Sequence, residues 1–164
     1  MSSSDDAART RAAVPSANED VRVQHVMKGY RADTYSQIET LVFMAFFERE
    51  HAVFCRNLEA QISEPVLKDL MGRIAKDEER HEEFFSNLVA HCLTTKREET
   101  VAAIAARAAE LQAVGGDIDA YQDKVAHVAE VGIFDADALR AAKSDRITAW
   151  GLADEPALRE FVTQ

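Results

Sequence analysis

The sequence contains few residues that interrupt helices and almost no pattern typical of strands. Its 164 residues include only three prolines and six glycines. Most of these stand at the ends of segments whose apolar residues recur at helical spacing. Alternation of apolar and polar residues, which marks half-buried strands, is nearly absent. The sequence therefore predicts an all-α fold.

Other absences restrict the partners. No apolar run approaches the roughly 20 residues that a membrane-spanning helix needs, and the N-terminus lacks the apolar segment of a secretory signal. The net charge of −10 opposes binding to nucleic acid, which requires a basic face, and gives no support for an anionic membrane surface. Cys55 and Cys92 are expected to be small buried hydrophobes in a reducing compartment. We therefore expect a cytoplasmic protein with no nucleic-acid or membrane partner.

The chain divides into a short tail and one helical domain. Residues 1–20 are small or charged without an apolar period, and we predict a disordered tail there. Residues 21–164 can form a core, since 47% of the chain is hydrophobic. We expect helices over residues 34–61, 65–92, 96–114, 118–131, 135–149 and 156–162. The break at residues 63–65, with Ser63 as N-cap and Pro65 at the first helical position, makes the first two helices an antiparallel hairpin.

The second helix of this hairpin carries candidate metal ligands. Glu78 and His81 form a Glu-x-x-His motif, whose spacing places both side chains on one face of a helix. A carboxylate and an imidazole among apolar neighbours are costly unless something pairs with them, and a metal ion is a common partner. The apolar residues at helical spacing around the pair are Leu67, Leu70, Met71, Ile74, Phe85, Leu88 and Cys92.

The first helix carries a similar pair, Glu48 and His51. These residues fall on an apolar stripe formed by Ile38, Leu41, Met44, Cys55, Leu58 and Ile62. For Glu48 alone, a solvated run of charges is an equal alternative. In ferritin-like carboxylate bundles, two helices supply a Glu-x-x-His motif and two supply a single Glu. We therefore predict Glu48, Glu78 and His81 as metal ligands.

Two segments resemble a known family, the soluble acyl-carrier-protein desaturases. Residues 77–82 are similar to the family's D-E-x-R-H-E motif, and residues 47–50 resemble its Q-E-R-A-T segment. The resemblance covers about residues 30–156. It implies a ferritin-like helical bundle, here a half-bundle hairpin plus C-terminal helices. It also implies a di-iron site in which Glu48, Glu78 and His81 bind iron, and Asp77 is the candidate for orienting an imidazole.

The sequence departs from the family's pattern in three ways. Family members are about twice as long, and no residue before Ala32 matches their N-terminal ligands, so the chain resembles their C-terminal half alone. His51 occupies the position of a threonine associated with oxygen activation. We assign His51 a catalytic role or an extra ligand role, with a solvated imidazole as the alternative. Glu50 replaces a small residue and is expected to be exposed. The alternative for Asp77 is a surface ion pair with Arg80.

The resemblance implies an oxidative enzyme whose metal site is shared. A complete site needs roughly four carboxylates and two imidazoles, and this chain offers half of that set. A second subunit resembling the desaturase N-terminal half is the preferred source of the rest, and a second copy of this chain is the alternative. The implied reaction is O2-dependent desaturation or hydroxylation of an acyl chain, with acyl carrier protein and ferredoxin as further partners. A ferritin-like homodimer that binds iron, and a non-catalytic half that stabilises a desaturase, are the competing functions.

Overall fold

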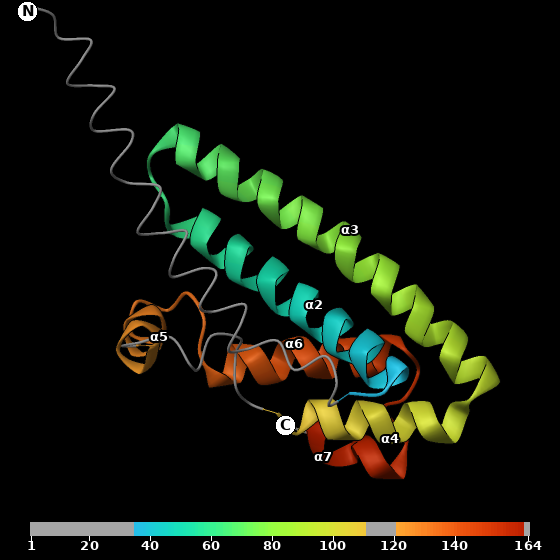
Figure 1. Ribbon diagram of the computed structural model, residues 1–164. Coiled ribbons are helices and arrows are strands. Elements are labelled where there is room, and N and C mark those ends of the chain that lie inside the picture. The colour runs from blue at the N-terminus through green and yellow to red at the C-terminus, as the bar shows by residue number, and fades with distance from the viewer. Residues whose placement is uncertain (1–34, 111–120, 163–164) are drawn as a thin grey trace, which may run out of the picture.

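A computed structural model describes residues 35–110 and 121–162 of the chain. Within these residues every regular element is a helix, as Figure 1 shows. The predicted all-α fold is therefore confirmed. The predicted tail over residues 1–20, the predicted helix end at residue 114 and the predicted helix start at residue 118 lie outside the described residues. The elements are α2 (Gln37–Gln61), α3 (Pro65–Thr95), α4 (Arg97–Ala108), α5 (Tyr121–Glu130), α6 (Ala136–Ala149), the short 3-10 helix η1 (Pro156–Leu158) and α7 (Arg159–Val162).

Local capping explains where the hairpin helices begin. Ser36 and Glu39 form a capping box at the start of α2, in which the Glu39 amide donates to the Ser36 hydroxyl and the Ser36 amide donates to the Glu39 carboxylate. The residue that caps the start of α3 is Glu64. The prediction of Ser63 as the N-cap is therefore wrong. The Glu64 carboxylate accepts the amides of the two residues after Pro65. Its longer side chain can therefore satisfy two amides at once.

The later helices also begin and end at residues with a clear local role. The Asp135 carboxylate accepts the Ala138 amide at 2.8 Å and caps α6. Gly132 and Gly151 follow the ends of α5 and α6 with φ of 71° and 73°. This left-handed backbone conformation is readily adopted by glycine and ends a helix. The helix ends predicted at residues 131 and 149 therefore agree with the structure to within one residue.

The apolar core lies at one end of the α2–α3 hairpin. In Figure 1, α2 and α3 run side by side, and α4, α6 and α7 gather away from the turn that joins them. The core residues come from the first half of α2, the last part of α3, and the helices that pack there. They are Ile38, Val42, Ala45, Phe46, Val89, Val101, Ala103, Ile104, Ala108, Ile147, Leu152 and Leu158. The other end of the hairpin extends beyond this core.

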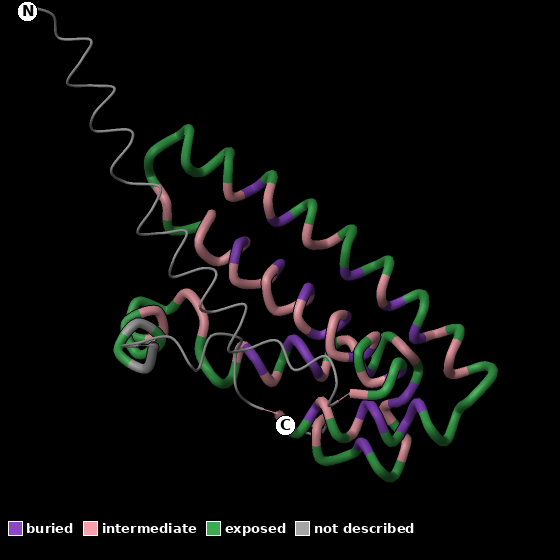
Figure 2. Tube along the Cα trace, viewed as in Figure 1, coloured by how far each residue is buried: buried purple, intermediate pink, exposed green. Residues whose placement is uncertain are grey.

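The side of α3 that faces α2 differs from the one predicted. Small and polar residues form the buried side, namely Gly72, Ala75, Glu82, Ser86 and Val89. The end of the Glu59 side chain, from α2, lies over Gly72, where an added Cβ would be 2.5 Å from its carboxylate oxygen. Three leucines predicted to face inward are exposed instead, Leu67 at 45%, Leu70 at 48% and Leu88 at 36%. Figure 2 shows this exposed outer edge of α3 in green.

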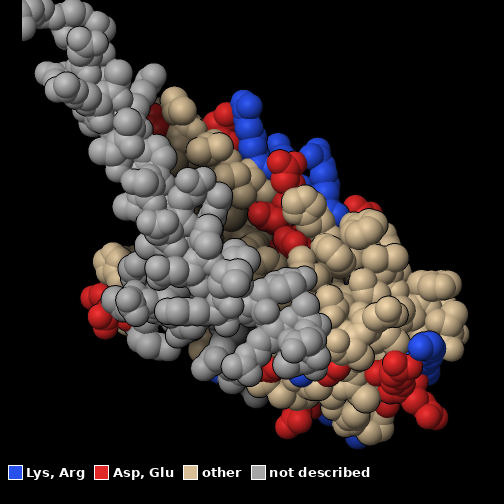
Figure 3. All heavy atoms as spheres, in the orientation of Figure 1, with Lys and Arg blue, Asp and Glu red and all other residues tan. Residues whose placement is uncertain are grey.

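The burial of the cysteines, the composition of the helices and the distribution of surface charge also bear on the sequence predictions. Cys55 is buried as expected, whereas Cys92 is only half-buried, and both are free thiols. None of the described helices has the length and apolar composition needed to cross a membrane. On the face drawn in Figure 3, acidic and basic side chains lie next to each other over the hairpin.

Candidate metal centre

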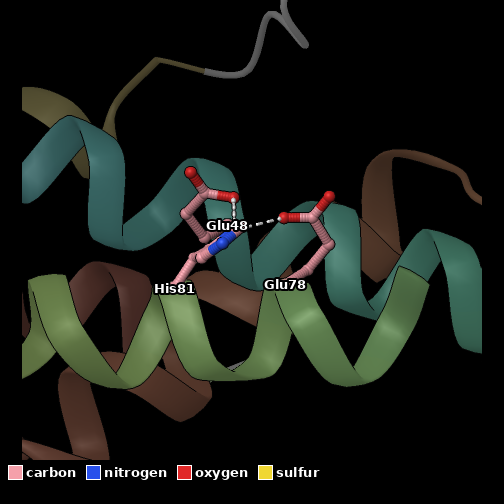
Figure 4. Close-up of side chains that lie close together, drawn as sticks. All are labelled: Glu48, Glu78 and His81. Atoms are coloured by element: carbon pink, nitrogen blue, oxygen red, sulfur yellow. Dashed lines mark hydrogen bonds and ion pairs between the residues drawn. The ribbon is translucent and has the colours of Figure 1, made fainter. Parts of the chain in front are cut away.

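The structure brings Glu48, Glu78 and His81 together between the two hairpin helices. Glu48 projects from α2, and Glu78 and His81 project from α3, so that one potential ligand atom of each lies within 4.8 Å of the others. His81 Nδ1 is 3.0 Å from Glu78 Oε2 and 3.8 Å from Glu48 Oε2, as drawn in Figure 4. Two carboxylates and an imidazole therefore converge on one small volume.

This cluster is buried on one side and open on the other. The exposed fraction of the side chain is 9% for Glu48, 21% for Glu78 and 58% for His81. Exposure therefore increases from α2 toward the outer edge of α3, where the apolar side chains are also exposed. The open side of the cluster lies along an apolar helix edge that no described element covers.

The two carboxylates perturb each other. Burial, followed by the hydrogen bond and charge of Glu78, raises the pKa of Glu48 to about 7, although His81 opposes this shift. Burial would also raise the pKa of Glu78, but hydrogen bonds with Glu48 and His81 and the nearby charge of His51 lower it. Glu78 is thus the ionised member of the pair, and Glu48 holds a proton near neutral pH.

The donor set fits a divalent cation. Two carboxylates at close range repel one another when both are ionised, and a cation between them removes that repulsion and replaces the shared proton. Carboxylate oxygens and imidazole nitrogens are ligands suited to iron. The hydrogen bond that His81 makes to the Glu78 carboxylate raises the pKa of His81, although desolvation opposes this shift, so a metal would compete with a proton for this imidazole. These residues can therefore hold a metal ion.

His51 lies beside the cluster rather than within it. Its ring packs against the ring of Phe47, with the centroids 4.0 Å apart. Burial lowers the pKa of His51, and the charge of Glu78 partly opposes that shift. The Glu78 charge therefore affects the pKa of His51. His51 is not one of the three residues whose potential ligand atoms converge. Its role in oxygen chemistry stays a prediction.

Asp77 lies on the exposed side of α3. Its carboxylate accepts a hydrogen bond from Arg80 at 2.7 Å, and both side chains are largely exposed. This is the surface ion pair that the sequence offered as the alternative. Orientation of an imidazole by Asp77 remains a prediction for an assembled site.

Glu50 is not exposed as expected, since only 12% of its side chain is accessible to solvent. It points away from the metal cluster and pairs with Lys143 of α6, whose Nζ lies 3.6 Å from Glu50 Oε1. Burial raises the pKa of Glu50 to about 7 against the opposing effect of Lys143, and burial likewise lowers the pKa of Lys143. The pair borders a cavity of about 20 Å³ lined by Phe43, Phe46, Phe47, Glu50, Arg107, Glu110 and Lys143.

Sequence reasoning missed Lys143, although its position carries a signal. Lys143 follows Leu139 and precedes Ile147 by one helical turn each, and all three are buried on the same side of α6. A lysine on an apolar stripe needs an anionic or carbonyl partner. Glu50, two residues from a predicted ligand and therefore on another side of α2, is a natural partner.

Comparisons with known proteins identify the family. A family model described as fatty acid desaturase matches residues 9–162, and the chain belongs to this family. Two curated proteins of Mycobacterium tuberculosis, from strains CDC 1551 / Oshkosh and ATCC 25618 / H37Rv, are each named putative acyl-ACP desaturase DesA2. Each is 67% identical to this chain over 154 residues, which are 94% of this chain and 56% of the relative.

A solved structure gives the same result for the fold. The X-ray structure of putative acyl-ACP desaturase DesA2 from Mycobacterium tuberculosis H37Rv matches with a TM-score of 0.79 and 61% identity, over 94% of this chain and 60% of that chain. The family resemblance and the ferritin-like helical fold predicted from the sequence are therefore confirmed. The chain spans a little over half the length of the curated relatives that it matches.

Proposed function

We propose that this chain supplies Glu48, Glu78 and His81 to a non-haem di-iron site of an acyl-ACP-desaturase-type oxidoreductase. The observation that carries the proposal is the convergence of two carboxylates and an imidazole within 4.8 Å, in a member of the fatty acid desaturase family. Ferritin-like di-iron sites are built from these donors. When bound, the di-iron group supplies the oxidising power for O2-dependent desaturation or hydroxylation of an unactivated C–H bond in an acyl-type substrate.

Each residue takes a distinct role in this proposal. Glu78 lies within reach of both Glu48 and His81, so the two carboxylates and the imidazole would hold the metal group together. His51, beside the Glu78 charge, is assigned to the side where dioxygen binds, and Asp77 to orienting an imidazole from the partner.

Proton release accompanies metal binding at these residues. Glu48, with a pKa of about 7, must lose its proton before its carboxylate can serve as a full ligand. His81 must likewise present a neutral nitrogen. Metal affinity is therefore expected to rise with pH through the neutral range.

The other half of the ligand set comes from a second pair of helices in this proposal. The exposed edge of α3, defined here as the seam, carries Leu67, Leu70, Ile74, Asp77, His81, Phe84 and Leu88. These positions alternate in steps of three and four residues, as in helices that pack along a shared stripe. We propose that a chain resembling the desaturase N-terminal half covers the seam, with a second copy of this chain as the alternative.

Charge also bears on the partners. This chain has a net charge of −10, which opposes direct docking of an acidic carrier protein. We therefore place the docking of acyl carrier protein, and of the ferredoxin that supplies electrons, on the partner subunit. A basic surface on that subunit is the expected counterpart.

Iron content of the assembled protein tests the site. The chain is co-expressed with its partner, and iron per chain is measured by inductively coupled plasma mass spectrometry. Glu78→Ala and His81→Ala should each abolish stoichiometric iron, whereas Glu83→Ala, at an exposed position of the same helix, should retain it. Wild-type iron content in both ligand variants would contradict the assignment.

Product analysis then separates an enzyme from a storage protein. The iron-loaded assembly is reduced and supplied with dioxygen and an acyl carrier protein bearing a saturated chain. Loss of two hydrogens in the product mass indicates desaturation, and gain of one oxygen indicates hydroxylation. An iron-loaded assembly that leaves the acyl chain unchanged supports iron binding or a stabilising role instead.

A further inference from the structure

An ionic network centred on the buried Glu82 lies beside the candidate metal cluster and involves the neighbours of its residues in sequence. Glu82 follows His81 on α3, and Arg49 follows Glu48 on α2. Glu82 is buried, and its Oε2 lies 3.9 Å from Arg49 Nη1. The residues that follow two of the candidate ligands therefore face each other across the hairpin.

The third helix, α6, completes this network. Arg146 Nη2 donates a short hydrogen bond to Glu82 Oε1, and Arg146 Nη1 donates to the Ser86 hydroxyl at 2.9 Å. Trp150 Nε1 donates to the same hydroxyl at 2.9 Å. We call the set of Arg49, Glu82, Ser86, Asp145, Arg146 and Trp150 the clamp, with Asp145 included because it accepts from Arg49 at 3.1 Å.

The clamp constrains rotation and sliding of the two hairpin helices. Successive residues on an α-helix point about 100° apart, so fixing the direction of Glu82 also fixes the direction of His81. Each oxygen of Glu82 faces a different guanidinium group, and a guanidinium is a planar fork with preferred directions for its hydrogen bonds. A buried carboxylate that loses these partners is strongly unfavourable, so α3 has little freedom to turn.

We propose that the clamp holds α2 and α3 in the rotation and register that bring Glu48, Glu78 and His81 within reach of one metal. In this inference Glu82 and Arg146 are positioning residues, which act on the metal through the ligands rather than by touching it. The inference rests on the proposed function, since it assumes that the cluster binds metal. It adds a set of residues on α6 that contribute no ligand.

Cobalt(II) is the probe for the test, because its visible absorption reports both affinity and ligand geometry. The assembled wild-type protein is titrated with cobalt(II), and so are Glu82→Gln and its matched control Glu83→Gln. Glu83 is the next residue on α3 and is exposed, so the control makes the same charge change outside the clamp. We expect Glu82→Gln to weaken cobalt(II) binding about tenfold, a loss typical of residues that support ligands, and the control to bind as the wild type does.

The visible spectrum at saturating cobalt(II) distinguishes positioning from general stabilisation. A displaced ligand should shift or weaken the absorption bands even when every site is filled. A clamp that only stabilises the fold would lower the free energy of unfolding but leave the saturated spectrum unchanged. Arg146→Lys is measured in parallel, because it keeps the positive charge but removes the planar guanidinium group. It also provides a second test if Glu82→Gln does not fold.

The outcomes separate this inference from the proposed function. Weaker binding with an altered spectrum in either clamp variant, and an unaltered control, supports positioning. Wild-type affinity and spectrum in the folded clamp variants overturns it, and so does a loss of stability with an unchanged spectrum. If the wild type itself binds no cobalt(II) in the assembled state, the proposed metal site fails and the inference fails with it.

Discussion

Glu48 shows most clearly the energetic conflict within the candidate metal centre. Its carboxyl group is buried against a second carboxyl group, and in the metal-free protein it holds a proton to a pKa of about 7. When it is ionised, such a carboxylate destabilises the fold, but a bound cation turns the same charge into a favourable interaction. At the scale of the residue, the arrangement proposed to bind metal therefore carries an energetic cost for the metal-free fold.

Replacement of Glu48 by glutamine should remove this cost. Between the ordinary pKa of 4.5 and the folded value of about 7, the folded state keeps a proton that the unfolded state has released. The Glu48 contribution therefore destabilises the fold progressively as pH rises through this window, and the full penalty remains above it. In metal-free protein at pH about 8, we expect Glu48→Gln to raise the free energy of unfolding by roughly 1–3 kcal/mol relative to the wild type.

Urea denaturation with chelator present measures this effect at pH about 5 and about 8. Glu50 has a raised pKa in the same range, so the comparison uses the difference between variant and wild type at each pH. A difference that does not grow between the two pH values would contradict the assigned state of Glu48.

His51 should titrate below its ordinary pKa of 6.5, since burial disfavours the imidazolium. The charge of Glu78 stabilises that imidazolium, so Glu78→Gln should lower the pKa of His51 further. Nuclear magnetic resonance of the ring protons follows the titration directly. A His51 pKa at or above 6.5 in the folded protein, or one insensitive to Glu78→Gln, would place His51 in solvent away from the cluster.

At the scale of the element, Lys143 holds three helices together. It reaches Glu50 on α2, and its Nζ donates hydrogen bonds to the carbonyl oxygens of Arg107 and Glu110 at the end of α4. Helix ends leave carbonyl groups that can accept further hydrogen bonds, and Lys143 donates to one carbonyl in the last turn of α4 and to one just beyond it. A single side chain of α6 thus sets the position of α2 and α4.

Loss of Lys143 should therefore cost more than loss of an ordinary surface charge. We expect Lys143→Met to lower the free energy of unfolding at pH about 7 by about 2–4 kcal/mol, because it leaves Glu50 buried without its partner. Adding Glu50→Leu should recover part of the loss, while the two hydrogen bonds from Lys143 to the carbonyl groups of Arg107 and Glu110 remain lost. Arg140→Gln, which removes an exposed charge from the same helix, is the matched control, and an equal effect in both would contradict this role.

The helices and the metal cluster could be predicted from sequence because their signals are local. Capping residues and glycines lie within one turn of the helix ends that they define, and Glu78 and His81 are brought together by helical spacing alone. The facing side of α3 was not predictable in this way. The helix has both an apolar stripe and a side with several small residues, and only the burial of residues such as Gly72 and Ala75 in the structure shows which side faces inward. Lys143 and Arg146 were missed because their partners are distant in sequence.

At the scale of the whole molecule, the seam on α3 leaves large apolar side chains in water. Leu70, Phe84 and Leu88 are exposed at 48%, 59% and 36% on the side where His81 opens to solvent. Exposed apolar surface of this kind typically marks an interaction site. The described residues thus present the cluster of Glu48, Glu78 and His81 and an exposed apolar surface along the same helix edge.

Association through the seam should be sensitive to charge. We expect Leu70→Glu combined with Leu88→Glu to dissociate the assembled protein, since burying two carboxylates in an apolar interface is unfavourable. Analytical ultracentrifugation measures the mass, and Lys76→Glu, exposed elsewhere on α3, serves as control. Sedimentation of the pure chain as a two-fold dimer would favour the second-copy alternative. A folded monomer that binds two irons and turns over substrate without a partner would contradict the proposed assembly.

The single tryptophan of the chain gives the clamp a built-in optical signal. Trp150 packs against Phe46, with ring centroids 5.7 Å apart, while its Nε1 donates to Ser86. Its fluorescence should therefore report separation of α6 from the hairpin. The turn between α2 and α3 lies far from this ring, so opening there would leave the emission unchanged while amide hydrogen exchange detects it. Comparison of the two signals would show whether the hairpin opens from its free end before the core comes apart.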